Sequence, residues 1–260
     1  MLMKTKALVL REVSYKESDR ILTLLTQERG KLSANARGSR KKGSAIAAGT
    51  QLLCWSELVL SETRGRWAVK EAAVERQFRG MRAELERFAL GCYFAEAAQV
   101  LALEELPTPE LLSLTLNSLH VLDKKPELPL ALVKTVFEWR CMCASGYEPQ
   151  LEGCALCGAP EPEQPRFHPL EGMLHCAACR PAEDSMPLSP AAMAALRQIV
   201  YGDPKKIFSF RLDGESLKQL GKISEHYMLL QLDRGFGPLD FYKQLSICRS
   251  RARISSRSSG

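Results

Sequence analysis

Apolar and polar residues alternate in five short runs over about the first 78 residues of the chain. A period of two is typical of strands that turn one face to a core and the other to solvent. The runs cover residues 4–13, 20–27, 30–37, 51–61 and 66–76. Turn signals such as Ser18-Asp19 and Thr63-Arg64-Gly65 separate them. Five short strands with spaced turns predict a small closed or nearly closed β-barrel.

The period of the pattern changes at Met81. From there to about residue 103, apolar side chains recur three and four positions apart, which is the spacing of an amphipathic helix. Thr108-Pro109 predicts the start of a second helix, with Thr108 as the N-cap and an end near residue 122. The pattern predicts further helices over residues 129–144, 190–202 and 214–232, and a short one around residues 239–245.

These elements predict an α+β multidomain protein. Residues 1–80 form the barrel domain, residues 81–247 a helical domain, and residues 248–260 a basic tail rich in Ser and Arg that we expect to be disordered. A stretch rich in Pro and Glu, at about 149–181, is predicted to be an insertion in the helical domain. The N-terminal apolar run is too short for a signal peptide or a membrane span, so we predict a cytoplasmic protein without membrane contact.

Basic residues are concentrated in the predicted barrel. Residues 1–80 hold 16 Lys and Arg against 8 Asp and Glu, although the whole chain has a net charge of only +6. The predicted helical domain is acidic, and the last twelve residues add four arginines. Such a segregation of charge favours a nucleic-acid partner for the barrel.

The segment 30–44 combines this charge with the alternation. Leu32, Ala34 and Ala36 are predicted to face the core, while the residues between them face solvent. A Gly- and Ser-rich loop with three consecutive cations follows. We predict that five basic residues of this segment contact a phosphate backbone: Lys31, Arg37, Arg40, Lys41 and Lys42. The alternative is a merely solvated charged face.

Two cysteine pairs are the most specific motif in the chain. Cys154 and Cys157 form one C-x-x-C pair and Cys176 and Cys179 the other, with eighteen residues between the pairs. This spacing predicts a four-cysteine zinc site, although an iron site has the same ligands. Four thiolates close the coordination sphere, so the predicted Zn²⁺ is structural. We interpret His168 and His175 as ordinary polar residues.

No catalytic constellation emerges from the sequence. The chain contains no G-x-x-x-x-G-K-[ST], H-E-x-x-H or G-x-S-x-G motif. The remaining cysteines show no pairing pattern, and Cys54 and Cys92 are interpreted as small hydrophobic residues. Trp55 and Trp67 could be core residues or base-stacking platforms, and we favour the core. The sequence therefore predicts that the protein is not an enzyme.

The chain resembles the bacterial RecO family of recombination mediators over nearly its whole length. The N-terminal block carries the resemblance most specifically, with YKESDRI at residues 15–21 and GKLSANARG at residues 30–38. The helical segment, the two cysteine pairs and the final helices also match, whereas the tail after Cys248 lies outside the family pattern. The resemblance implies that the five-stranded barrel is an OB-fold and that the helical domain holds a zinc-finger-like insertion.

The resemblance also implies a function and partners. Proteins of this family bind single- and double-stranded DNA, anneal complementary strands and act with RecR to help load RecA onto DNA coated by single-stranded-DNA-binding protein. The five basic residues match the basic N-terminal segment of the family. Some members lack the cysteines, so the metal is not expected to be required for the shared activity. A nucleoid-associated location follows from these partners.

Two other classes of protein stay open at this point. A metal-dependent nucleic-acid enzyme would be motivated only by the four cysteines, and a closed sulfur shell argues against it. A protein-only adaptor would use its basic face to meet an acidic protein partner. DNA binding at low salt separates the adaptor from a mediator, and metal-dependent cleavage or deamination of DNA would reveal the enzyme.

Overall fold

The computed structural model describes residues 1–179 and 184–257. This part of the chain divides into two compact units. One unit contains Met1–Pro126 together with the chain from Phe236 onward, and the other contains Glu127–Gly235. The first unit therefore joins the barrel to helices from both ends of the chain.

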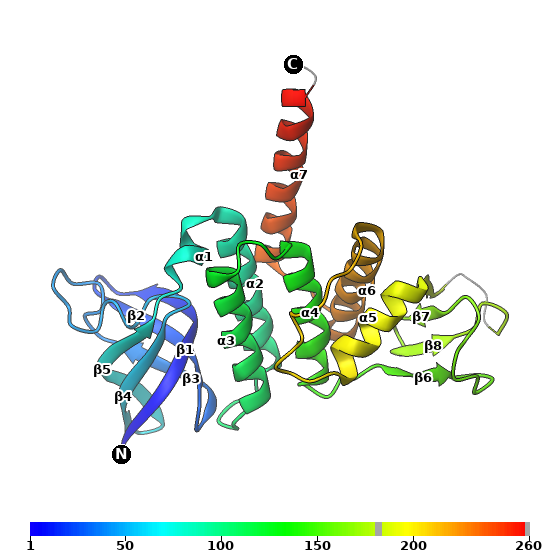
Figure 1. The fold of residues 1–260 in the computed structure, drawn as a ribbon. Coiled ribbons are helices and arrows are strands. Elements are labelled where there is room, and N and C mark those ends of the chain that lie inside the picture. Colours follow the sequence, from blue (N-terminus) through cyan, green and yellow to red (C-terminus); the bar gives the residue numbers. More distant parts are fainter. Residues whose placement is uncertain (180–183, 258–260) are drawn as a thin grey trace. The chain divides into compact units, whose positions relative to one another are not determined.

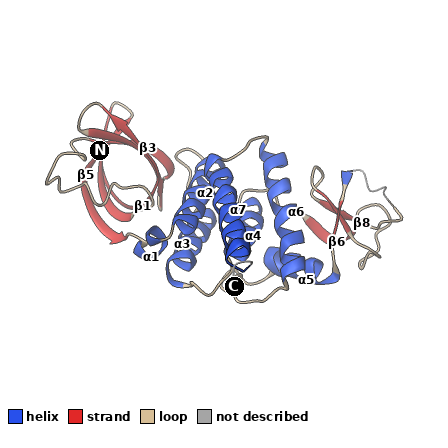
Figure 2. Cartoon of the chain, turned by 90° about the horizontal axis from the view of Figure 1, so that it is seen from above, coloured by secondary structure: helices blue, strands red, loops and turns tan. Residues whose placement is uncertain are grey.

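Five strands form a closed barrel at the start of the chain (Figures 1 and 2). They are β1 (Leu2–Tyr15), β2 (Asp19–Thr26), β3 (Gly30–Ala36), β4 (Trp55–Thr63) and β5 (Arg66–Arg76). The strand order is β1-β2-β3-β5-β4, and β3 and β5 pair in parallel while the other pairs are antiparallel. This is the topology of an OB-fold, and the prediction of a five-stranded barrel is confirmed.

The barrel core follows the predicted alternation. Leu32, Ala34 and Ala36 of β3 are buried, and Ser33 between them is exposed. Leu32 and Ala34 face Leu24 and Leu22 across the pairing with β2. Both tryptophans belong to the interior, because Trp55 is 9% exposed and Trp67 is 6% exposed.

The helices of the first unit are α1 (Arg79–Ala83), α2 (Leu85–Leu101), α3 (Pro109–Lys124) and α7 (Gly237–Arg257). The ring of Tyr93 on α2 meets Phe236, just before α7, edge-on at 5.3 Å between centroids. This contact brings the C-terminal helix to the N-terminal part of the chain.

Two sequence predictions need correction in this unit. Helix α7 continues to Arg257, so the expected disorder from Cys248 onward is wrong as far as that residue. Arg and Ala are strong helix formers, and neither Gly nor Pro interrupts residues 239–257. Thr108 precedes α3 as predicted but makes no capping hydrogen bond, because its φ and ψ of −126° and 70° are not those of an extended N-cap. Residues 258–260 lie outside the described chain.

A short pairing attaches the first residues of β3 to the chain between α2 and α3. The Lys31 N–H donates to the Leu103 carbonyl at 3.1 Å, and the Glu105 N–H donates to the Lys31 carbonyl at 3.0 Å. Gly30 adopts a φ of 58° next to this segment, and an added Cβ would collide with the Leu106 carbonyl. Glycine is therefore required at position 30.

The described part of the second unit contains three helices and a small sheet. The helices are α4 (Leu130–Cys143), α5 (Pro190–Tyr201) and α6 (Gly214–Leu232). The sheet has the order β6-β8-β7-β9, with β6 (Gln150–Cys154), β7 (Arg166–His168), β8 (Met173–His175) and β9 (Met186–Pro187). Trp139 of α4 stacks on Tyr227 of α6 and meets Phe167 of β7 edge-on, each at 5.3 Å. The predicted insertion therefore shares a core with the helices; its residues 180 and 181 are not described.

A buried charge network joins α4 to α6. Lys134 Nζ lies 2.9 Å from a carboxylate oxygen of Glu138 and 2.9 Å from one of Glu225. Ser224 donates to the other Glu138 oxygen at 2.6 Å. Burial alone would lower the pKa of Lys134, but the two carboxylates outweigh it and raise the pKa. The lysine is therefore held as a cation inside the unit.

Candidate nucleic-acid interface and metal centre

The cationic loop, residues 37–50, begins at a fixed point on the barrel. The Asp19 carboxylate accepts the Gly38 N–H at 2.7 Å, and the Arg40 N–H donates to the Ser18 carbonyl at 2.9 Å. Gly38 has a φ of 64°, a conformation that favours glycine. The turn between β1 and β2 therefore holds the start of the loop, which explains why Asp19 and Gly38 belong to the two N-terminal motifs.

The end of the loop is also fixed. Ile46 is 9% exposed and packs into the barrel core. Thr50 donates to the Ile46 carbonyl at 2.7 Å, and Ser56 of β4 donates to the Gly49 carbonyl at 2.9 Å. A Cβ at Gly49 would lie 2.8 Å from the Ala72 Cβ, so only glycine fits there. The loop is thus a folded segment that presents its cations from a defined base.

Four of the five predicted basic residues lie together on this loop. Arg37, Arg40, Lys41 and Lys42 are exposed, and none makes an ion pair with a described residue. The nearby Asp19 is occupied by hydrogen bonds from the backbone and from Ser18. These four side chains therefore have their full charge available for an external anion.

Lys31 lies elsewhere, at the other end of β3. Its side chain is only 15% exposed, and its ammonium group donates to the Gln99 carbonyl at 2.9 Å and lies 3.4 Å from Glu104. The structure thus uses this cation to attach the barrel to α2. Alternation alone could not reveal this, because the partner is a backbone carbonyl 68 residues away.

Exposed apolar side chains beside the loop were missed from the sequence. Tyr15 is 43% exposed at the end of β1, and Val13 and Ile21, which pair across β1 and β2, are 42% and 36% exposed. The Lys16 ammonium lies 5.4 Å from the centroid of the Tyr15 ring. The sequence signal that could have revealed this surface is the presence of apolar residues at outward-facing positions of the β1–β2 hairpin, next to charged residues.

The four predicted metal ligands converge. The sulfur atoms of Cys154, Cys157, Cys176 and Cys179 all lie within 4.8 Å of one another. Cys157 Sγ and Cys176 Sγ are 3.7 Å apart, close to the edge of about 3.8 Å expected for a tetrahedron with Zn–S bonds of about 2.3 Å. The donor set and its spacing therefore fit a tetrahedral metal ion.

The backbone around Cys154 favours its thiolate. Burial alone would raise the pKa of Cys154, but N–H groups of Cys157, Cys176 and Leu156 outweigh it and lower the pKa to about 5. Gly158 closes the first knuckle with a φ of 74° and donates its N–H to the Cys154 carbonyl at 2.9 Å. Glycine suits the left-handed backbone conformation that this turn requires at position 158.

The two histidines near the cysteines take a different role. The Glu171 N–H donates to His168 Nδ1 at 3.2 Å, and His175 Nε2 lies 3.2 Å from the Glu171 carboxylate. Neither histidine belongs to the group of possible metal ligands found among the described residues.

Two cysteines outside the cluster carry partly buried thiols. Burial raises the pKa of Cys92 to about 11 and that of Cys143 to about 12, so both thiols stay protonated.

Fold and site together define a class: multidomain OB-fold proteins that carry a tetracysteine cluster in their helical part. Two family profiles match the chain, "Recombination protein O N terminal" over residues 1–78 and "Recombination protein O C terminal" over residues 82–239. The chain belongs to the RecO family and is therefore a DNA repair and recombination protein.

Relatives named "DNA repair protein RecO" align along nearly the whole chain. The protein from Acetivibrio thermocellus is 36% identical over 94% of this chain and 97% of its own length. The proteins from Desulforudis audaxviator and Alkaliphilus metalliredigens are 30% and 29% identical, over 95% and 94% of this chain and 98% and 100% of their own lengths. Within the described residues, we find no helix with the length and apolar character needed to cross a membrane.

Proposed function

We propose that the protein is a recombination mediator that binds single- and double-stranded DNA and anneals complementary strands. With RecR, it helps to load RecA onto DNA coated by single-stranded-DNA-binding protein. The observation that carries the proposal is the cationic loop, with four exposed basic side chains on a folded base. Membership of the RecO family supports the same activity.

The physical basis of annealing is electrostatic. Two complementary strands are polyanions, and their repulsion opposes the encounter that precedes pairing. Cations that contact the phosphates release condensed counterions and lower this repulsion without reading the bases. Tyr15, exposed beside the loop, adds a ring on which an unpaired base can stack.

The cysteine cluster serves the fold in this proposal. We infer that it holds Zn²⁺, with Cys154, Cys157, Cys176 and Cys179 as ligands, because tetrahedral sulfur sites suit zinc. Such an ion joins the two cysteine knuckles of a small sheet and offers no open position for substrate. The protein then acts through binding and presents no catalytic group.

An annealing assay tests the proposal directly. Complementary oligonucleotides, each coated beforehand with the cognate single-stranded-DNA-binding protein, are mixed with and without this protein. Duplex formation is followed by energy transfer between end labels. We expect faster annealing with the wild type and a loss of the acceleration in Lys41→Ala/Lys42→Ala. An equal rate with and without the wild-type protein would refute the proposed activity.

A further inference from the structure

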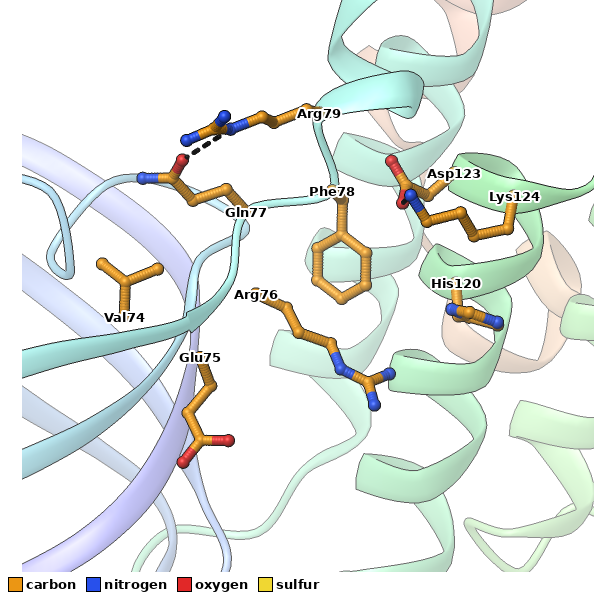
Figure 3. Close-up of a pocket in the computed structure, with 9 residues that line it drawn as sticks. All are labelled: Val74, Glu75, Arg76, Gln77, Phe78, Arg79, His120, Asp123 and Lys124. Atoms are coloured by element: carbon orange, nitrogen blue, oxygen red, sulfur yellow. Dashed lines mark hydrogen bonds and ion pairs between the residues drawn. The ribbon is translucent and has the colours of Figure 1, made fainter.

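A second basic site lies at the junction between the barrel and the helices of the first unit. A cleft of about 460 Å³ opens where β5 ends and the chain enters α1, and the last turns of α3 face it. Arg76, Phe78 and Arg79 line one side, while His120, Asp123 and Lys124 line the other (Figure 3). A cavity of this size accommodates a nucleotide unit or a phosphate group.

Both acidic side chains that line the cleft already have partners. The Asp123 carboxylate accepts the N–H groups of Gly80 and Met81 at 2.6 and 3.1 Å and lies 3.1 Å from the Lys124 ammonium. Burial alone would raise the pKa of Asp123, but these interactions lower it. The second acid, Glu75, pairs with Lys6 at 2.9 Å. Neither carboxylate neutralises the arginines.

The two arginines of the cleft therefore leave an excess of positive charge. Arg76 and Arg79 are exposed, and neither makes an ion pair with a described residue. Arg79 only donates to the neutral amide of Gln77 at 3.2 Å. Figure 3 shows Arg76 reaching from the strand end toward α3, while Arg79 turns to the other side beside Gln77. A phosphate oxygen can meet either guanidinium group without displacing a carboxylate.

The backbone between the two arginines is strained. Phe78 adopts a φ of 48° and a ψ of 55° and is a buried residue, only 4% exposed. A left-handed conformation is unfavourable for a bulky residue, and such strain gathers at functional sites. Here it produces the sharp change of direction from β5 into α1 and places Arg76 and Arg79 at the edge of the same cleft.

The cleft adjoins the segment that returns from the cationic loop. Arg82 of α1 donates to the carbonyls of Leu52 and Gln77, the second at 2.7 Å. The Cys54 thiol donates to the Arg76 carbonyl at 3.5 Å. Residues just after the loop therefore touch the residues that line the cleft.

From this arrangement we infer that the cleft binds two phosphate groups of a DNA strand, one at Arg76 and one at Arg79, and forms a second contact site, separate from the loop. The inference rests on the proposed function, in that the protein must bind DNA at all. Guanidinium groups pair with phosphate oxygens through charge-assisted hydrogen bonds and read no base. The cleft thus extends the sequence-independent surface from the barrel to α3.

The test compares Arg76→Ala/Arg79→Ala with the wild type by fluorescence anisotropy, using a labelled oligothymidylate over a range of salt concentrations. Loss of two phosphate contacts should reduce the slope of log K against log salt by about 1.4 for a single strand. Arg66→Ala, an exposed cation at the opposite end of β5, is the matched control and should keep the slope. Arg76→Lys/Arg79→Lys should restore most of it, and thermal unfolding checks that each variant is folded.

Each possible result bears on one claim. A slope in Arg76→Ala/Arg79→Ala equal to that of Arg66→Ala, while the wild type binds DNA, would overturn the cleft and leave the loop standing. Absence of DNA binding by the wild type would overturn the proposed function itself. If inorganic phosphate stabilises the wild type but not the double variant, and DNA binding is unchanged, the cleft takes free phosphate and the inference is wrong.

Discussion

We expect DNA binding through the cationic loop to weaken with salt, and the structure predicts the size of this effect. Four loop cations, Arg37, Arg40, Lys41 and Lys42, are exposed without an acidic partner among the described residues. Each phosphate contact contributes about −0.7 to the slope of log K against log salt on a single strand, so the loop alone contributes about −2.8. Lys41→Ala/Lys42→Ala halves this contribution to about −1.4.

The difference is large enough to measure by anisotropy with a labelled single strand. Between about 50 and 200 mM salt, the loop contribution weakens binding about 50-fold in the wild type and about 7-fold in the double variant. Lys31→Ala, on the β-strand β3 that leads into the loop, is the control, because the Lys31 ammonium is already bound to the Gln99 carbonyl and Glu104. We expect an unchanged slope in this variant and a loss of about 1 kcal/mol of stability from the missing hydrogen bond.

Two results would refute this reasoning. An identical slope in the wild type and in Lys41→Ala/Lys42→Ala would show that the loop does not contact phosphates. A reduced slope in Lys31→Ala would show that this ammonium leaves its partners on α2 to meet DNA.

Three further predictions concern metal, stability and pH. Cys157→Ser should lose the bound zinc measured by atomic absorption, whereas Cys248→Ser should keep it; a full equivalent of zinc in the first variant would contradict the assignment. Glu138→Ala removes the more deeply buried of the two carboxylates that pair with Lys134 and should lower the free energy of unfolding in urea by about 3–5 kcal/mol, whereas Lys134→Met/Glu138→Leu should lose much less; equal losses would count against the network. The pKa of Asp123 in the folded protein lies below its ordinary value of 3.8. The ionised carboxylate therefore stabilises the folded state above pH 3.8, and this contribution is lost as the pH falls through the folded pKa. The stability advantage over Asp123→Asn should therefore shrink between pH 7 and pH 3, and a constant difference would exclude this cause.

Local patterns could predict the elements but not all of their limits. The alternation located β5 over its full length, and the helical pattern located α6. The strand predicted from residue 51 begins only at Trp55, because Leu53 is a fully buried loop residue with a φ of 58°. A buried apolar residue in a loop has the same sequence signature as a core strand residue.

In the candidate site, too, features set by neighbouring residues could be predicted, whereas features set by distant parts of the chain could not. The four-cysteine cluster could be predicted because a C-x-x-C knuckle is a local structure. The engagement of Lys31 depends on Gln99, and the place of α7 depends on the contact between Tyr93 and Phe236. Such contacts between distant parts of the chain leave no local pattern. The cleft at Arg76 was missed for the same reason, because α3 supplies one side of it.

The attachment of Lys31 to the segment before α3 has a consequence for motion of the proposed DNA-binding surface. Strand β3 is held at its first residues by the pairing with Leu103 and Glu105, and just beyond its last residue by Asp19 through Gly38. A slip by one residue would turn its core side chains outward, so the strand cannot slide to adjust to a ligand. Any adaptation to the path of a DNA strand must therefore come from rotation of side chains and from the loop beyond Gly38, while its base keeps a fixed register with the helices of the same unit.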